Sequence, residues 1–270
     1  MPKNRAVTSR EYKLILSVDR FEDRQKGARV FGGLVEFLAN RQKVEIENQD
    51  REKQRLTWYL DTPGLALRRH GYVLRVRKKK EKDEYNVTLK YRHSDRYLSA
   101  CRDLSSSIKG DPKFEEDILP PFRSKFSHST KVKMDTAPAL KTMGDVRQLY
   151  PGLDLDEIEA RADSPVRPVK GFTANEVARD LCKIRFDGKD PVVKAGLSFW
   201  YLGSGKDEIP LVAEFSFDYD VKDPDATDEL EQFPAHVVQS CNRLFETLQH
   251  QTAWTNPNFT TKTSYAYSAL

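Results

Sequence analysis

The sequence has few cysteines and no long apolar run, and both absences narrow the class of protein. Its three cysteines, Cys101, Cys182 and Cys241, are odd in number and widely spaced within 270 residues. This argues against a disulfide framework or a cysteine metal site and favours a reducing compartment. No segment approaches the roughly 18 apolar residues of a membrane span, and residues 1–5 open no secretory signal. We therefore expect a cytoplasmic protein without a membrane partner.

Common catalytic motifs are also missing. There is no glycine-rich phosphate loop and no nucleophile elbow, and the five histidines have no metal-ligand spacing. What the chain has in abundance is charge of both signs. It carries 45 basic and 41 acidic residues, 32% of the chain is charged, and the mean hydropathy is -0.69. Because the net charge is only +4, the positions of the charges say more than their sum.

Three segments have the apolar spacing of amphipathic helices. They are residues 24–40, residues 138–149 and a segment that begins near Pro234. The second should end before Pro151 and Gly152, and Pro234 suits the first turn of the third. We expect each helix to cover a core with one apolar face and to carry no chemistry.

Five further segments alternate apolar and polar residues with the period of a β-strand. The first runs from Glu11 to Asp19, where Ile15 is the one apolar residue on the polar face. The same pattern recurs in residues 72–77, 86–92, 182–186 and 211–220. The polar positions are mostly full charges, and the signs separate: strands around residues 75, 90 and 184 are basic, and those around 116 and 216 are acidic.

A charged strand face is ordinarily the wet side of an antiparallel sheet. Separation of the charges by sign favours a second interpretation, in which helices cover the apolar face and the charged face points inward. We therefore predict an α+β fold built on a closed antiparallel β-barrel with amphipathic helices outside. A lumen lined by both signs needs a ligand that satisfies both, because unpaired charge in a desolvated site is costly. A polyphosphate with a divalent cation meets this need, since Lys and Arg bind phosphate oxygens and carboxylates bind Mg²⁺ or Mn²⁺.

A set of motifs in fixed order carries a resemblance to a known family. Residues 59–77 combine a Tyr-Leu-Asp-Thr strand with a Leu-Arg-Val-Arg strand. They are followed by residues 88–90 (Thr-Leu-Lys), 115–117 (Glu-Glu-Asp), 183–185 (Lys-Ile-Arg) and 261–265 (Thr-Lys-Thr-Ser-Tyr). The set resembles the CYTH, or triphosphate tunnel metalloenzyme, superfamily. The resemblance implies an eight-stranded tunnel barrel, formed by one domain over residues 1–270 with a helical and loop insertion at about 120–171.

The resemblance also implies roles for individual side chains. Glu11 and Lys13 would be catalytic. The substrate phosphates would be held by Lys13, Arg75, Arg77, Lys90, Lys183, Arg185 and Lys262. The metal, Mg²⁺ or Mn²⁺, would be held by Glu11, Glu115, Asp117, Glu214 and Asp218. A register shift of one residue would turn Glu116 inward in place of its neighbours.

Two positions depart from the family pattern. Ser9 stands where the first acid of the amino-terminal Glu-x-Glu-x-Lys motif is expected, and Ser216 replaces the second acid of a later Glu-x-Glu motif. Asp218 follows on the same strand face as Ser216 and can substitute for it. The basic residues of the family pattern are all present, whereas two of its acidic residues are replaced by serine.

The run Lys78–Lys82 has two interpretations. It could bind nucleic acid, but its place between two strands favours a solvated hairpin loop, so no nucleic-acid partner is expected. Arg68 and Arg69 could reach a tunnel mouth or only solvent.

These observations predict metal-dependent hydrolysis of inorganic tripolyphosphate or a nucleoside triphosphate. The first alternative is a class IV-like adenylyl cyclase or a thiamine triphosphatase. The second is a catalytically weakened module that binds polyphosphate or nucleotide. The identity of the triphosphate and the oligomeric state are left open.

Overall fold

The computed structural model describes residues 6–188, 190–203, 208–220, 233–256 and 261–268. Its strands are β1 (Ser9–Leu16), β2 (Val44–Asp61), β3 (Tyr72–Lys79), β4 (Tyr85–His93), β5 (Gly110–Leu119), β6 (Arg123–Met134), β7 (Arg167–Phe186), β8 (Val193–Tyr201) and β9 (Val212–Asp220). Its helices are η1 (Val18–Phe21), α1 (Arg24–Ala39), α2 (Ala66–Arg69), α3 (Arg96–Ala100), α4 (Met143–Leu149), α6 (Ala235–Gln249) and α7 (Lys262–Ser268). None of the helices within these ranges is long and apolar enough to cross a membrane.

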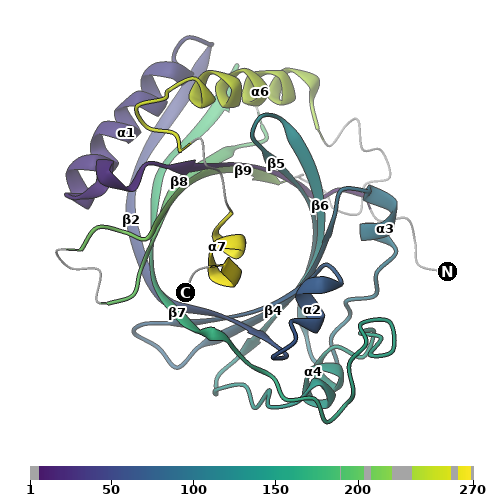
Figure 1. Cartoon of the computed structure of the whole chain (residues 1–270). Coiled ribbons are helices and arrows are strands. Elements are labelled where there is room, and N and C mark those ends of the chain that lie inside the picture. The colour runs from purple at the N-terminus through teal and green to yellow at the C-terminus, as the bar shows by residue number, and fades with distance from the viewer. Residues whose placement is uncertain (1–5, 189, 204–207, 221–232, 257–260, 269–270) are drawn as a thin grey trace.

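The strands close into a barrel, as predicted, in the order β1-β5-β6-β4-β3-β2-β7-β8-β9 (Figure 1). The predicted number of eight was wrong, since the described residues form nine strands. The expectation of purely antiparallel pairing was also wrong, because β1 pairs with β5 in parallel, with Glu11 opposite Asp117. The remaining neighbours pair in antiparallel fashion.

Strand β6 accounts for part of the difference in strand number. It lies within the segment expected as an insertion at about 120–171, of which the part between β6 and β7 runs outside the barrel. Its buried positions are Ser127, His128, Ser129, Thr130 and Val132. Only one of these is strongly apolar, so the alternation that marks the other strands is hidden. Polar side chains on both faces therefore concealed a barrel strand.

The outer face of β1, β7, β8 and β9 packs against α1 and α6, which lie side by side outside the ring in Figure 1. Tyr12 of β1 stacks on Phe217 of β9 with ring centroids 4.6 Å apart and meets Phe245 of α6 at 5.3 Å. Phe31 of α1 meets Phe215 of β9 at 5.1 Å. These aromatic contacts confirm that the apolar strand face points outward, to the helices.

A second core lies outside β3 and β4, under the segment that contains α4. α4 begins at Met143, later than the predicted 138, because Thr142 and Asp145 form a capping box that fixes the start of the helix. Similarly, β1 ends at Leu16, before the predicted Asp19, because the chain turns into η1.

The lumen contains a helix. Figure 1 shows α7 inside the ring of strands, and its Ala266 and Tyr267 pack in a buried cluster with Ile15, Tyr59, Val73 and Trp200. This cluster explains why Ile15 interrupts the polar face of β1: its side chain packs in the apolar cluster that α7 joins. The charged part of the lumen lies beyond this apolar part.

Candidate functional site

A cavity of about 520 Å³ occupies the charged part of the lumen. It is lined from opposite sides of the ring, by Glu11, Lys13 and Asp218 on β1 and β9 and by Arg75 and Arg77 on β3. The strand register produces this arrangement, because successive inward positions on each strand are two residues apart. The sequence-predicted charges therefore meet in one space.

The basic side of the cavity is organised around one buried carboxylate, that of Glu176 on β7. Glu176 accepts hydrogen bonds from Nε of Arg55 at 2.7 Å and from the hydroxyls of Thr57 and Ser198 at 2.7 and 2.8 Å. Nε of Arg77 lies 3.3 Å from its Oε2. Burial alone would raise the pKa of Glu176, but the surrounding cations hold it well below its usual range. Glu176 is therefore an anion that fixes the positions of the neighbouring cations.

Positive charge remains in excess beyond Glu176. Burial and the neighbouring Arg75 lower the pKa of Arg77 to about 9, despite the attraction of Glu176. The Nε atom of Arg75 is buried without a hydrogen-bond acceptor, and no described carboxylate forms an ion pair with this side chain. Two adjacent arginines, of which only Arg77 has a carboxylate partner, form a site for an anion.

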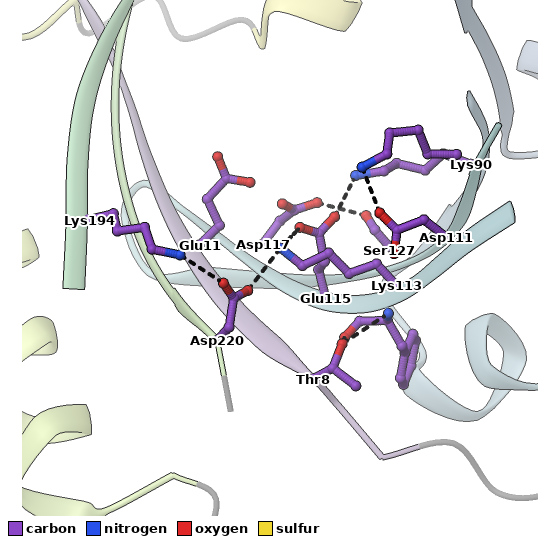
Figure 2. Close-up of polar contacts among 12 residues, drawn as sticks. Thr8, Glu11, Lys90, Asp111, Lys113, Glu115, Asp117, Ser127, Lys194 and Asp220 are labelled. Atoms are coloured by element: carbon purple, nitrogen blue, oxygen red, sulfur yellow. Dashed lines mark hydrogen bonds and ion pairs between the residues drawn. The ribbon is translucent and has the colours of Figure 1, made fainter. Parts of the chain in front are cut away.

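Two acids of β5 already have cationic partners. Oδ1 of Asp117 lies 2.5 Å from Nζ of Lys13, and its Oδ2 lies 2.7 Å from Nη2 of Arg92. Glu115 lies 2.9 Å from Lys90 and 3.0 Å from Lys113, an arrangement that Figure 2 shows. Burial opposes ionisation at both sites, but the cations outweigh it.

The pKa of Glu115 falls to about 2, and the pKa of Asp117 falls well below its usual range. Both acids remain charged and neutralised at neutral pH. Their partners leave them little capacity for a metal ion.

In a second pair of acids, only one member has a cationic partner. Glu11 and Asp218 are direct partners in the β1–β9 register. Glu11 has an ion pair with Lys13 at 2.8 Å, whereas Asp218 has none among the described side chains. Burial, and then repulsion from Glu11, raise the pKa of Asp218 to about 7. A cation between the two carboxylates would remove this repulsion.

The donor set at this pair fits a hard divalent cation. Mg²⁺ is commonly held by one or two carboxylates together with water and substrate phosphates. Glu11 and Asp218 supply two carboxylates. No group of three His, Cys, Asp or Glu side chains in the described part of the chain is placed to hold a metal by itself. The two carboxylates therefore fit a cation that is also bound by the phosphate oxygens of a ligand.

The remaining predicted residues lie at different places around the lumen. Lys262, the first residue of α7, lies 2.9 Å from Glu214 and 3.5 Å from Glu176, so Glu214 is paired rather than free. Lys183 lines the cavity and pairs with the exposed Glu47 at 3.0 Å. Arg185 lies 3.9 Å from Asp190 and does not line the cavity.

The register of β5 settles which of its acids face inward. Glu116 forms an ion pair with Arg10 at 2.6 Å, and Arg10 also donates to the hydroxyl of Tyr219, which belongs to the outer core. Glu115 and Asp117 therefore face the lumen, and the alternative with Glu116 inward was wrong.

The two serines that depart from the family pattern lie within the sheet as expected. Ser9 is fully buried between β5 and β9, opposite Glu115 and Asp220, and its hydroxyl has no hydrogen-bond partner. Ser216 lines the cavity opposite Lys13. At both positions a carboxylate would face the lumen.

The sequence motifs did not include three side chains of the candidate site: Glu176, Arg55 and Arg92. Arg92 lies on the polar face of the predicted strand 86–92, so alternation had already placed it inward. Arg55 and Glu176 lie in long strands whose charged residues occupy both faces, which hides the alternation. Arg55, Thr57 and Tyr59 are spaced two residues apart, and this spacing was the signal in the sequence that could have placed Arg55 on the inner strand face.

The structure also shows where the basic residues lie for which the sequence allowed two interpretations. The Lys78–Lys82 run spans the hairpin between β3 and β4, as predicted. Arg68 lies 5.0 Å from the ring of Tyr267 on α7, whereas Arg69 lies 3.7 Å from the exposed Glu159. Of the two arginines, Arg68 therefore contacts the helix in the lumen.

Comparisons with known proteins agree with this fold. Residues 34–118 match the family model of the CYTH domain. No curated protein matches the sequence. A solved structure from Hippeastrum, named as a candidate adenylyl cyclase and described as having a dominant triphosphatase activity, is 13% identical with a TM-score of 0.50, over 97% of this chain and 96% of that chain.

Two further solved structures match with lower TM-scores. A candidate adenylate cyclase from Bacillus halodurans is 14% identical with a TM-score of 0.43, over 99% of this chain and 100% of that chain. One from Vibrio parahaemolyticus is 11% identical with a TM-score of 0.40, over 98% and 99%. Residues 34–118 are thus similar to a CYTH domain, and the chain as a whole shares its fold with the Hippeastrum protein.

Proposed function

We propose that the protein hydrolyses a triphosphate in its lumen with the help of Mg²⁺ or Mn²⁺. One observation carries the proposal: Arg75 on β3 and Asp218 on β9 line the same cavity, and neither has an ion pair among the described residues. A triphosphate with a divalent cation has the charges that both sides lack. The activity described for the Hippeastrum protein belongs to the same class of reaction.

The proposed division of labour follows from the positions of the side chains. Arg75 and Arg77 would bind the phosphate oxygens, and Lys90 and Lys13 would complete the cationic side. Phosphoryl transfer needs positioning and charge neutralisation more than covalent help. Because Glu176 fixes Arg77, the site would be organised before the substrate enters. A lumen carboxylate would accept the proton of the attacking water.

Glu11 and Asp218 would hold the divalent cation. When bound, the cation would neutralise charge that develops on the phosphate chain. Without it, these two carboxylates would repel the substrate, so turnover is expected to depend on metal.

The decisive experiment is a phosphate-release screen with tripolyphosphate, ATP and thiamine triphosphate, each with Mg²⁺, Mn²⁺ or EDTA. We expect release with metal, and loss of release in Glu11→Ala and Asp218→Asn. Asp220→Asn is the matched control, because Asp220 pairs with Lys113 and Lys194 at 3.1 and 3.2 Å (Figure 2). Absence of release from all three substrates would refute the hydrolase. Cyclic AMP from ATP would select a cyclase instead.

A second candidate function is binding without turnover. Ser216 stands in place of an acid, and Glu214 pairs with Lys262, so only Asp218 and Glu11, which itself pairs with Lys13, are left for the metal. Tripolyphosphate binding that is independent of metal and unaccompanied by phosphate release would favour this module. The same screen therefore separates the two functions when calorimetric binding is measured alongside it.

A further inference from the structure

Helix α1 has one face that packs on the barrel and an opposite face that is exposed. Ala28, Phe31 and Val35 are buried in the core between the helix and the strands. The exposed face carries two large apolar side chains, Val30 and Phe37, whose exposed fractions are 54% and 59%. Because these two residues are about two turns apart, their side chains point in the same direction.

Three cations surround these two apolar side chains. Lys26 lies one turn before Val30, and Arg29 directly precedes it. The guanidinium group of Arg41 lies 5.1 Å from the centre of the Phe37 ring. All three cations are exposed, and none of them forms an ion pair with another described residue. The face therefore combines apolar surface with unpaired positive charge.

The acids near α1 lie at its margins. Glu36, the one acid within α1, is half-buried on the side of the helix that lies near Cys182. Glu22 and Asp23 precede the first turn, where the Asp23 carboxylate accepts a hydrogen bond from the backbone of Lys26 at 2.9 Å. The exposed face of α1 is therefore complementary in charge to an anionic partner.

The size of this face favours a lipid surface over a protein partner. A helix of 16 residues is about 24 Å long, and a face about 10 Å wide covers about 240 Å². A stable protein interface takes about 800 Å² from each partner and needs matching shapes. An anionic membrane needs no matching shape, because it attracts each Lys or Arg near its surface and takes up apolar side chains between its headgroups. A second copy of the chain is disfavoured, because two such faces would bring like charges together.

We propose that the exposed face of α1 is a peripheral docking surface for an anionic lipid membrane. Val30 and Phe37 would enter the headgroup region, and the three cations would lie at the level of the lipid phosphates. The expectation of no membrane partner came from the lack of an apolar span, which contact with one surface of a bilayer does not need. This inference goes beyond the proposed function and does not rest on it.

The position of α1 separates this surface from the lumen. Figure 1 shows α1 outside the ring of strands, whereas the candidate site lies inside the ring. None of the residues of α1 lines the lumen cavity. Contact through α1 would therefore leave the lumen accessible, and changes to this face should not alter phosphate release in solution.

The test is co-sedimentation of the full chain with vesicles of phosphatidylcholine, with and without phosphatidylserine. A charge variant replaces the three cations of the face: Lys26→Gln, Arg29→Gln and Arg41→Gln. An apolar variant carries Phe37→Gln. Polyglutamate serves as a soluble acidic polymer, and analytical ultracentrifugation reports the oligomeric state of each protein.

Matched controls carry the same kinds of change on other exposed elements. The charge control replaces three exposed cations at or near α4: Lys109→Gln, Lys141→Gln and Arg147→Gln. The apolar control is Leu98→Gln, at a 49% exposed position of α3. A thermal melt checks that each variant is folded.

We expect the original protein to bind vesicles only when they contain phosphatidylserine, and more weakly as salt is added. The charge variant should bind about 100-fold more weakly, because each basic residue near an anionic surface contributes about fivefold to the affinity. Phe37→Gln should bind about tenfold more weakly, through loss of buried apolar area. Both controls should bind like the original protein.

Four results would overturn the proposal. The first is no binding to vesicles that contain phosphatidylserine, and the second is unchanged binding by the charge variant or by Phe37→Gln. The third is polyglutamate binding that the charge variant loses while vesicles are not bound, which would select an acidic protein as the partner. The fourth is a dimer that Phe37→Gln disperses, which would select a second copy of the chain.

Discussion

Oε2 of Glu176 lies 3.3 Å from Nε of Arg77, and the Glu176 side chain has no exposed surface. The same carboxylate receives two hydrogen bonds from Arg55, at 2.7 and 3.0 Å. A buried acid in an anion site repels an anionic ligand, yet it orients two arginines and leaves Arg75 uncompensated. Orientation of the guanidinium groups before binding reduces the entropy that binding must overcome.

Replacement of Glu176 by Gln should strongly destabilise the protein. The change leaves Arg55, Arg77 and Lys262 without their shared counter-charge, and breaking a buried ion pair typically costs about 3–5 kcal/mol. We expect a loss of this size in the free energy of unfolding, measured by urea denaturation, and partial rescue by tripolyphosphate. Glu81→Gln on the exposed hairpin is the control. A loss no larger than that of the control would contradict the role of Glu176.

Arg75→Met should weaken tripolyphosphate binding without unfolding the protein. Hydrogen bonds to charged groups contribute about 1.5–3 kcal/mol, which corresponds to a dissociation constant about 10- to 100-fold higher. Arg75 has no described acidic partner, so its loss leaves no buried acid unpaired. Calorimetric titration checks the affinity, and a thermal melt checks the fold. Arg29→Met on the outer surface of α1 should leave binding unchanged.

The pH dependence of stability should reveal the pairing of Glu115. Its pKa is lowered from 4.5 to about 2, because Lys90 and Lys113 outweigh the effect of burial. A depressed carboxyl pKa gives stability that is present above the unfolded pKa and lost as the pH falls through the folded one. The free energy of unfolding should therefore decline between about pH 4.5 and pH 2.

Glu115→Gln should flatten this acid limb, as measured by urea denaturation at a series of pH values. Glu81→Gln controls for the loss of one carboxylate. Identical acid limbs in the original protein and Glu115→Gln would show that Glu115 is not paired in solution.

Ile15→Ala should loosen the apolar cluster beneath α7. The side chain is 6% exposed and packs with Trp200, Tyr59 and residues of α7. Removal of a buried Ile side chain to Ala costs about 2–5 kcal/mol, and a change to Val about 0.5–1.5 kcal/mol. Urea denaturation should place the two variants in this order. An Ile15→Ala cost as small as that of Val30→Ala, at a 54% exposed position on α1, would rule out this packing.

The barrel could be predicted because the alternation of apolar and polar residues follows from strand geometry and is visible in the sequence without tertiary information. β1, β3, β4 and β9 each place apolar residues outward and charges inward, as period two requires. β6 was not predicted because all but one of its buried positions are Ser, His or Thr, and the first half of β2 because both of its faces are polar. The parallel β1–β5 pair depends on closure of the ring, which no local pattern encodes.

The sequence predicted that charged side chains face the lumen, but it did not predict which of them form ion pairs with one another. The sequence suggested Glu115 and Asp117 as metal ligands, whereas in the structure both form ion pairs with cationic side chains. The sequence suggested Asp218 as a substitute for a missing acid, and among the described acids that line the cavity it is the one without an ion pair. Which acid is neutralised depends on cross-barrel distances, and these arise from strands far apart in sequence.

Ser216→Glu should strengthen the metal site. Ser216 lines the cavity opposite Lys13 and lies two residues before Asp218 on the same face of β9. A carboxylate here would add a third negative ligand beside Glu11 and Asp218, and metal affinity rises with the number of charged ligands. We expect the Mn²⁺ dissociation constant to fall about tenfold, or about 1.4 kcal/mol, with faster phosphate release from tripolyphosphate at limiting metal.

Ser216→Gln has the same size without the charge and should leave Mn²⁺ affinity close to that of the original protein. Calorimetric titration of Mn²⁺ into each protein separates charge from side-chain volume. If the Glu and Gln variants bind Mn²⁺ equally, the metal does not lie beside Asp218, and the Glu11–Asp218 pair loses its proposed role. If affinity rises but phosphate release does not, the metal binds at this pair and the module without turnover is the better account of the lumen.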